Sequence, residues 1–157
     1  MKIELLVIGK TSFPYLKEGI EIYQKRLKHY VPFTLTVLPD VKNARKMRAE
    51  ELKRKEGELI LKKLSPTDQL YLFDERGKAF TSVKFSQFLE RQMQSSHKRL
   101  VFVVGGAFGF SDAVYQRANG KITLSAMTFS HQMIRLFIVE QVYRAMTIMR
   151  GEPYHNE

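Results

Sequence analysis

The sequence predicts an α/β fold: a single domain over residues 1–157, with a mainly parallel sheet flanked by helices. Short apolar runs that end in glycine, proline or aspartate alternate with longer segments whose apolar residues recur every three or four positions. The first pattern is typical of buried strands and the second of amphipathic helices. Strands that alternate with helices indicate a layered fold with parallel strands. No linker or internal repeat interrupts the alternation.

The first half of the chain contains two expected strands and two expected helices. Residues Ile3–Gly9 form an apolar run that ends in glycine, which predicts a buried strand. Pro14 suits the first turn of a helix. Four apolar side chains then recur at helical spacing: Leu16, Ile20, Tyr23 and Leu27. The alternating stretch Phe33–Pro39 predicts a second strand, and residues 43–64 predict a long charged helix.

The second half continues the same pattern with three strands and two helices. In chain order these are the strand Gln69–Asp74, the helix Val83–Met93, the strand Arg99–Gly106, the strand Lys121–Ser125 and the helix Gln132–Met149. We expect a turn at Arg76–Lys78, directly after the third strand.

The composition narrows the class of protein. The formal net charge of +10 indicates a polyanion as partner or, as a second reading, an anionic membrane surface. No cysteine is present, which excludes disulfides, zinc-thiolate sites and a cysteine nucleophile and suits the cytoplasm. No apolar stretch approaches the roughly 20 residues that cross a bilayer, and the start reads as a strand and not as a secretory signal. We therefore expect a cytoplasmic protein without a membrane segment.

Half of the net charge lies in one stretch, Lys42–Lys63. Its nine basic residues stand against four acidic ones. A solvated charged face and a surface that contacts RNA phosphates both fit this pattern, although the interspersed acids favour the first.

Three segments follow expected strands and should meet at the carboxyl edge of the sheet, where ligands of such folds bind. They are Asp74–Lys78, Gly105–Asp112 and Ser125–His131. The glycines of the second segment fit a tight turn into a helix capped by Ser111, or a backbone that a ligand approaches closely. The segment has neither the dinucleotide-binding spacing nor that of a phosphate-binding P-loop.

The last expected helix carries apolar side chains on nearly all of its faces, which predicts that other parts of the protein shield nearly all of them from water. Burial inside the chain would satisfy this requirement, but we expect the helix, with Val139, to pack against a second subunit. Glu140 and Arg144 are four residues apart, as in a simple intrahelical ion pair. Beyond Gly151 the chain ends in a short tail that carries Tyr154 and His155, and such tails are usually frayed.

Four motifs together resemble the small bacterial SPOUT-class methyltransferases that act on large-subunit ribosomal RNA. They are "GGAFGFS" from Gly105, "LSAMTFSH" from Leu124, "EQVYRA" from Glu140 and "EPYHNE" from Glu152. The resemblance covers the whole chain. It implies a homodimer with a C-terminal trefoil knot that uses S-adenosylmethionine to methylate N3 of a pseudouridine, with no metal. One departure is that Ala107 and Phe108 stand where the family usually has Pro-Glu.

The same resemblance implies the site residues. The cofactor-binding positions are Phe73, Gly105, Leu124, Ser125, Ala126, Met127, Thr128 and Phe129. The catalytic positions are His131, Glu140, Arg144, Tyr154 and His155. We expect the tail to reach an active site that the other subunit completes, with His155 suited to proton transfer near neutral pH. For His131, an N-cap or packing role fits equally well.

Two other functions remain open from the sequence. One is a non-catalytic basic RNA-binding protein of the ribosome, in which the glycine segment is only a turn. The other is a small α/β enzyme that acts on a nucleotide metabolite. The missing cysteine fits methylation at nitrogen, because methylation at a pyrimidine carbon commonly needs a cysteine adduct.

Overall fold

A computed structural model describes residues 1–156, so the last residue of the "EPYHNE" motif lies outside the described residues. It contains a five-stranded sheet in the order β2-β1-β4-β3-β5, and all neighbouring strands are parallel. The strands are β1 (Lys2–Ile8), β2 (Phe33–Leu38), β3 (Gln69–Ala79), β4 (Arg99–Val104) and β5 (Gly120–Thr123). The predicted α/β fold with a parallel sheet is confirmed.

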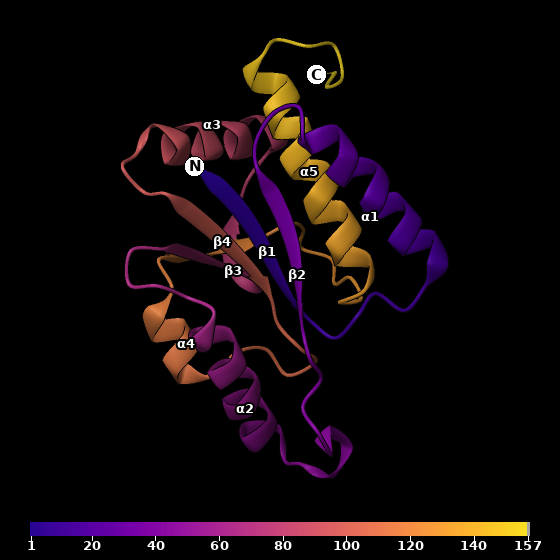
Figure 1. Cartoon of the computed structure of the whole chain (residues 1–157), viewed down its shortest axis with the longest axis vertical. Helices are drawn as coiled ribbons and strands as arrows, with labels where there is room; N and C mark the ends of the chain where they lie inside the picture. Colours follow the sequence, from indigo (N-terminus) through magenta and orange to yellow (C-terminus); the bar gives the residue numbers. More distant parts are fainter. Residues whose placement is uncertain (157) are drawn as a thin grey trace.

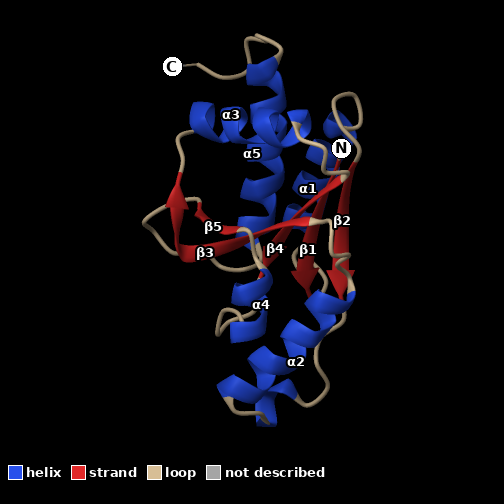
Figure 2. Ribbon diagram, turned by 90° about the vertical axis from the view of Figure 1, so that its left-hand side faces the viewer, coloured by secondary structure: helices blue, strands red, loops and turns tan. Residues whose placement is uncertain are grey.

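Helices cover both faces of this sheet (Figures 1 and 2). One layer holds α1 (Pro14–Leu27), α3 (Ser82–Gln94) and α5 (Met133–Met149), and the other holds α2 (Ala49–Lys62) and α4 (Asp112–Arg117). On the inner strand β1, Leu5 packs into the core on the α5 side and Leu6 into the core on the α2 side. Burial on both faces explains why β1 reads as a continuous apolar run.

The predicted turn at Arg76–Lys78 is wrong, because β3 continues to Ala79. Its pairing with β5 breaks register between Phe73 and Lys78, so the strand bends without ending. A Cβ atom at Gly77 would lie 2.5 Å from the backbone of Ile122. This glycine therefore permits a close approach of two strands and not a reversal of the chain.

Two helix predictions also need correction. Residues 43–48 do not belong to the long charged helix: Asn43 has a left-handed φ of 61°, a short 3₁₀ turn follows at Ala44–Lys46, and α2 begins at Ala49. The second concerns α4: a helix capped by Ser111 was one interpretation of the glycine segment, but no range was predicted for its six residues, which are too few to show a periodic pattern. Its predicted cap is present, since Ser111 Oγ accepts the N–H of Val114 at 3.4 Å.

The apolar helix α5 is covered mainly by its own chain, against α1 and α3. Val139, expected at a subunit interface, is completely buried in this core, so that expectation is wrong for this residue. Met133 and Phe137, in the first half of α5, keep exposed side chains. Within residues 1–156, no helix is both long and apolar enough to cross a membrane.

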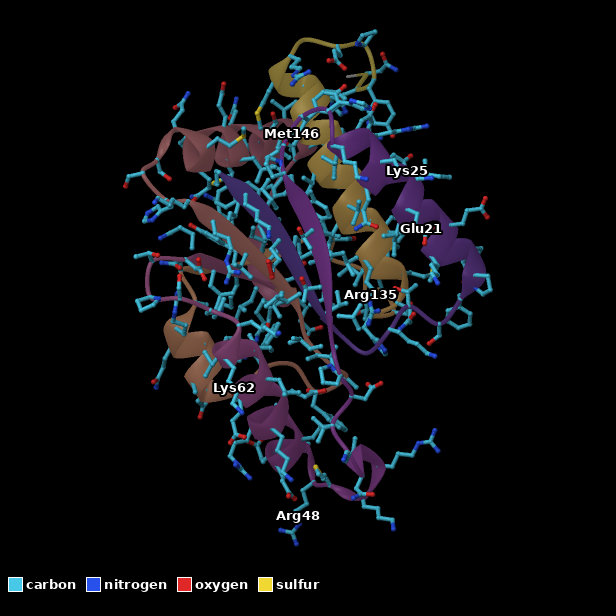
Figure 3. All side chains as sticks on the ribbon, viewed as in Figure 1. Glu21, Lys25, Arg48, Lys62, Arg135 and Met146 are labelled. Carbon is cyan, nitrogen blue, oxygen red and sulfur yellow. The ribbon has the colours of Figure 1, made fainter. Side chains whose placement is uncertain are left out.

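Arg135 fixes the start of α5 to the end of β1 and is only 1% exposed (Figure 3). Its guanidinium donates to the carbonyls of Ile8 and Gly9, both at 2.8 Å, and to Thr11 Oγ1 at 3.2 Å. Burial lowers the pKa of Arg135, and these hydrogen bonds compensate for the lost water. The contact holds the segment before α5 at the carboxyl edge of the sheet.

Candidate active site

A cavity of about 440 Å³ opens at the carboxyl ends of β3, β4 and β5. All three segments expected at this edge contribute to its wall: residues from 73–76, from 104–110 and from 122–131. Its volume lies within the roughly 300–1,000 Å³ that small-molecule sites occupy. The parallel arrangement of the strands therefore brings the three segments together around one cavity at the expected edge.

Most of the expected cofactor positions line this cavity. They are Phe73, Gly105, Leu124, Ser125, Met127, Thr128 and Phe129, and His131 lies in the same wall. Ala126 is exposed and does not line the cavity. Phe108, which replaces the acid usual in the family, is 54% exposed in the wall.

Short local hydrogen bonds hold the segment between β5 and α5. Thr123 Oγ1 donates to the carbonyl of Ser125 at 2.9 Å, and Ser125 Oγ accepts the N–H of Met127 at 3.0 Å. Ser130 Oγ accepts the N–H of Met133 at 3.1 Å. These bonds lie within the chain and fix the course of this wall of the cavity.

The glycines between β4 and α4 are needed for contacts inside the protein. A Cβ atom at Gly105 would lie 3.0 Å from the ring of Phe110, and one at Gly106 would lie 2.6 Å from Glu56 Oε2. Gly109 has a φ of +82°, which side chains rarely adopt. The missing side chains of Gly105 and Gly106 thus make room for Phe110 and Glu56, and Gly105 also lines the cavity, so its place among the cofactor positions stays a prediction.

Asp74, Arg76 and Tyr115 form a polar group in the cavity wall that the sequence analysis did not include among its site residues. Asp74 accepts the Tyr115 hydroxyl and also the backbone N–H of Arg76 at 2.8 Å, while Arg76 Nη2 donates to the Tyr115 hydroxyl at 2.9 Å. Burial alone would raise the pKa of Asp74, but these hydrogen bonds outweigh it and lower the pKa. An ionised carboxylate thus faces the cavity from the end of β3.

Asp74 and Glu75 are the carboxylates in the cavity wall. Within residues 1–156, no group of three or more histidine, cysteine or acidic side chains is arranged to hold a metal ion.

The remaining expected residues form a second group, the tail cluster of Glu140, Arg144, Tyr154 and His155. Three bonds meet at Glu140 Oε1: from Arg144 Nη2 at 2.6 Å, from Arg144 Nε at 3.1 Å and from the Tyr154 hydroxyl at 2.9 Å. The expected ion pair on α5 is therefore present, and it also anchors the tail. Burial and hydrogen bonds to Tyr23 and Glu140 raise the pKa of Tyr154.

Aromatic rings surround the tail cluster. The ring of Tyr154 meets that of Tyr143 edge-on at 4.9 Å, and the Arg144 guanidinium lies 4.7 Å from the centre of the Tyr154 ring. Tyr30 donates to Glu152 at 2.5 Å, a bond that raises the pKa of Tyr30 to about 12. The tail is thus docked on α1 and α5 and is not frayed.

His155 has a defined role in this network, because Arg144 Nη1 lies 3.1 Å from its Nδ1 atom. A guanidinium can only donate hydrogen bonds, so Nδ1 must be the acceptor. In a neutral ring bonded in this way, the hydrogen is on Nε2. His155 therefore acts as the acceptor that holds Arg144, and its Nε2 atom is buried.

The cavity and the tail cluster lie apart within one chain. His131 precedes α5, and Glu140 follows nine positions later, which is about 13 Å along a helix. The tail docks still farther along, near the opposite end of α5 (Figure 1). The expected grouping of His131 with the tail cluster is therefore absent within the single chain, and a second copy would have to bring the two together.

The chain matches known proteins over its whole length. A family model described as "Predicted SPOUT methyltransferase" matches residues 1–155. A protein of Parabacteroides distasonis named "Ribosomal RNA large subunit methyltransferase H" is 59% identical over 157 residues, which is 100% of both chains. Proteins of the same name from Flavobacterium johnsoniae and Cytophaga hutchinsonii are both 54% identical, over 100% and 99% of this chain and 100% of each relative. The chain belongs to the SPOUT methyltransferase family, and this membership implies the C-terminal trefoil knot.

Proposed function

We propose that this protein is a cytoplasmic enzyme, one domain over residues 1–157, that methylates N3 of a pseudouridine in large-subunit ribosomal RNA with S-adenosylmethionine. The observation that carries the proposal is the cavity at the carboxyl edge of the sheet, built from the family's motifs. Full-length relatives named as methyltransferases of large-subunit ribosomal RNA support the choice of substrate.

The cavity fits the proposed cofactor in size and chemistry. S-adenosylmethionine, when bound, supplies an electrophilic methyl group on a positively charged sulfur. Phe73, Leu124 and Phe129 offer apolar surface for an adenine ring, and the ionised Asp74 offers a partner for a cationic or hydroxyl group.

The tail cluster fits the other half of the reaction. N3 of the target base carries a proton that must leave, so negative charge develops on the base. Arg144 can steady this charge, and His155, whose Nδ1 accepts from Arg144 Nη1, holds that guanidinium in place. In this arrangement His155 is a positioning residue, the methyl group leaves sulfur for N3, and the N3 proton passes to solvent water.

The separation of cavity and tail cluster favours a homodimer. A second copy that places its tail cluster over this cavity would bring both halves of the site within reach of one base. Proximity of this kind can supply a large part of a rate enhancement.

The test is transfer of a tritiated methyl group from S-adenosylmethionine to large ribosomal subunits that lack the modification. We expect stoichiometric incorporation, with the label in N3-methylpseudouridine after digestion to nucleosides. If the protein binds these subunits but transfers no methyl group, the non-catalytic RNA-binding function is correct. Label in a different nucleoside would contradict the proposed target.

A further inference from the structure

The connection between β2 and α2 carries a concentrated positive charge. Residues 42–48, which we term the basic connection, contain no acid and four exposed cations: Lys42, Arg45, Lys46 and Arg48. The left-handed Asn43 and the 3₁₀ turn at Ala44–Lys46 bend this segment away from helical geometry. Arg48, at the end of the connection, points outward from the molecule (Figure 3).

Three of the four cations of α2 are in a different state, because acids of the same helix pair with them. Lys53 lies 2.8 Å from Glu50, Arg54 lies 2.9 Å from Glu58, and Lys55 lies 3.8 Å from Glu51. Within residues 1–156, the side chains of the basic connection make no ion pair and no hydrogen bond. Four uncompensated cations at one bend make this segment the stronger attractor of anions.

The fold places the basic connection on the side of the molecule where the chemistry is proposed. β2 runs parallel to β1, β4 and β3, so the chain leaves β2 at the carboxyl edge of the sheet, as it does at the cavity. From there α2 packs against the glycine segment, where Glu56 lies beside Gly106. An extended polyanion on the basic connection can thus continue past the start of α2 toward the cavity.

We propose that the basic connection is the surface that binds the phosphate backbone of the RNA substrate, and that the paired cations of α2 contribute little. The inference rests on the proposed function for the identity of the polyanion. Lysine and arginine that neutralise phosphates release condensed counterions, which is the main source of sequence-independent affinity for RNA. Cations already paired with acids release fewer counterions and give less.

The experiment compares two double variants with the same change in charge. Arg45→Gln/Arg48→Gln removes two cations of the basic connection, and Arg54→Gln/Lys55→Gln removes two paired cations of α2. Binding of a fluorescein-labelled fragment of large-subunit ribosomal RNA is measured over a series of salt concentrations. We expect the first variant to reduce the log–log salt slope by about 1.4–1.8, from about 0.7–0.9 per lost contact, and the second to change it by less than about 0.5.

Other outcomes overturn the proposal. Equal losses in the two variants would mean that only net charge matters, and an unchanged slope in the first would place the RNA elsewhere. Selective loss of binding to phosphatidylserine vesicles, with RNA binding intact, would make the segment a membrane contact. Because binding is measured without methyl transfer, a wild-type protein that binds RNA but does not methylate it would contradict the proposed function alone. Wild-type protein with no salt-dependent RNA binding would contradict the basic connection itself.

Discussion

Different kinds of chemical groups form the cavity and the tail cluster. Backbone, glycines and apolar side chains of three segments form the cavity, and short hydroxyl-to-backbone bonds hold its wall. The tail cluster instead gathers long charged and aromatic side chains around one oxygen, Glu140 Oε1. The first construction suits recognition of a shape, and the second suits placement of charge and hydrogen-bond donors. The difference teaches that the two halves should fail separately when they are mutated.

The largest expected effect comes from removing the tail. A chain truncated after Gly151 loses Tyr154 and His155 but keeps every residue of the cavity wall. We expect methyl transfer to fall by at least about 100-fold, as for the loss of groups that act in the transition state. Calorimetric titration with S-adenosylmethionine should give an affinity within about twofold of wild type. A truncated enzyme with wild-type turnover would show that the tail cluster has no part in the reaction.

The converse experiment damages the cavity and spares the tail cluster. In Gly105→Val the new side chain meets the Phe110 ring, so we expect the cofactor affinity to fall more than about tenfold and stability to fall by about 1–3 kcal/mol. Ala126→Val, in an exposed position outside the cavity wall, is the matched control and should bind the cofactor normally. Calorimetry and thermal unfolding measure both effects. If Ala126→Val also loses cofactor affinity, the segment Ser125–His131 must bind the cofactor in a conformation other than the one that lines this cavity.

Within the tail cluster, His155 should contribute less than the whole tail. His155→Ala is expected to lower turnover by about tenfold while cofactor binding is unchanged, because it removes the acceptor that holds Arg144 Nη1 and leaves the bonds of Arg144 and Tyr154 to Glu140 in place. Nitrogen chemical shifts of the ring provide a readout that is independent of activity. They should show hydrogen on Nε2 in wild type, and this preference should weaken in Arg144→Gln. Hydrogen on Nδ1 in wild type would reverse the assigned role.

The contrast also explains what the sequence could predict. Strands and long helices follow from period, and parallel pairing then brings the segments around Phe73, Gly105 and Leu124 to one edge without any knowledge of the family. The tail cluster depended on the resemblance, because no pattern in a short terminal segment predicts docking on α1 and α5. Arg135 bonds to backbone carbonyls and Asp74 to the Tyr115 hydroxyl. Both contacts join residues far apart in the sequence, so no local pattern predicts them. The need for glycine at position 106 could not be predicted for the same reason, because the Glu56 carboxylate that lies against its backbone comes from α2.

The smallest expected effect concerns two acids, Glu140 and Glu56, whose carboxylates differ in the hydrogen bonds that they accept. Glu140 accepts several hydrogen bonds, whereas Glu56, 8% exposed beneath Gly106, accepts none within residues 1–156. Burial, and then the charge of Asp40, raise the pKa of Glu56. Between the pKa of the unfolded chain and this raised value the folded state holds more protons, so stability falls as the pH rises through that window.

Glu56→Gln cannot ionise and should escape this loss of stability. We expect its melting temperature to exceed that of wild type at pH 8, and the difference to shrink as the pH approaches 4. At this chain length each 1 kcal/mol corresponds to roughly 2–4 °C. Glu58→Gln, an exposed acid of the same helix, should change little at either pH, because exposed ion pairs stabilise weakly. A Glu56→Gln protein that is less stable than wild type at pH 8 would mean that the ionised carboxylate supports the glycine segment, and the cavity would then depend on charge as much as the tail cluster does.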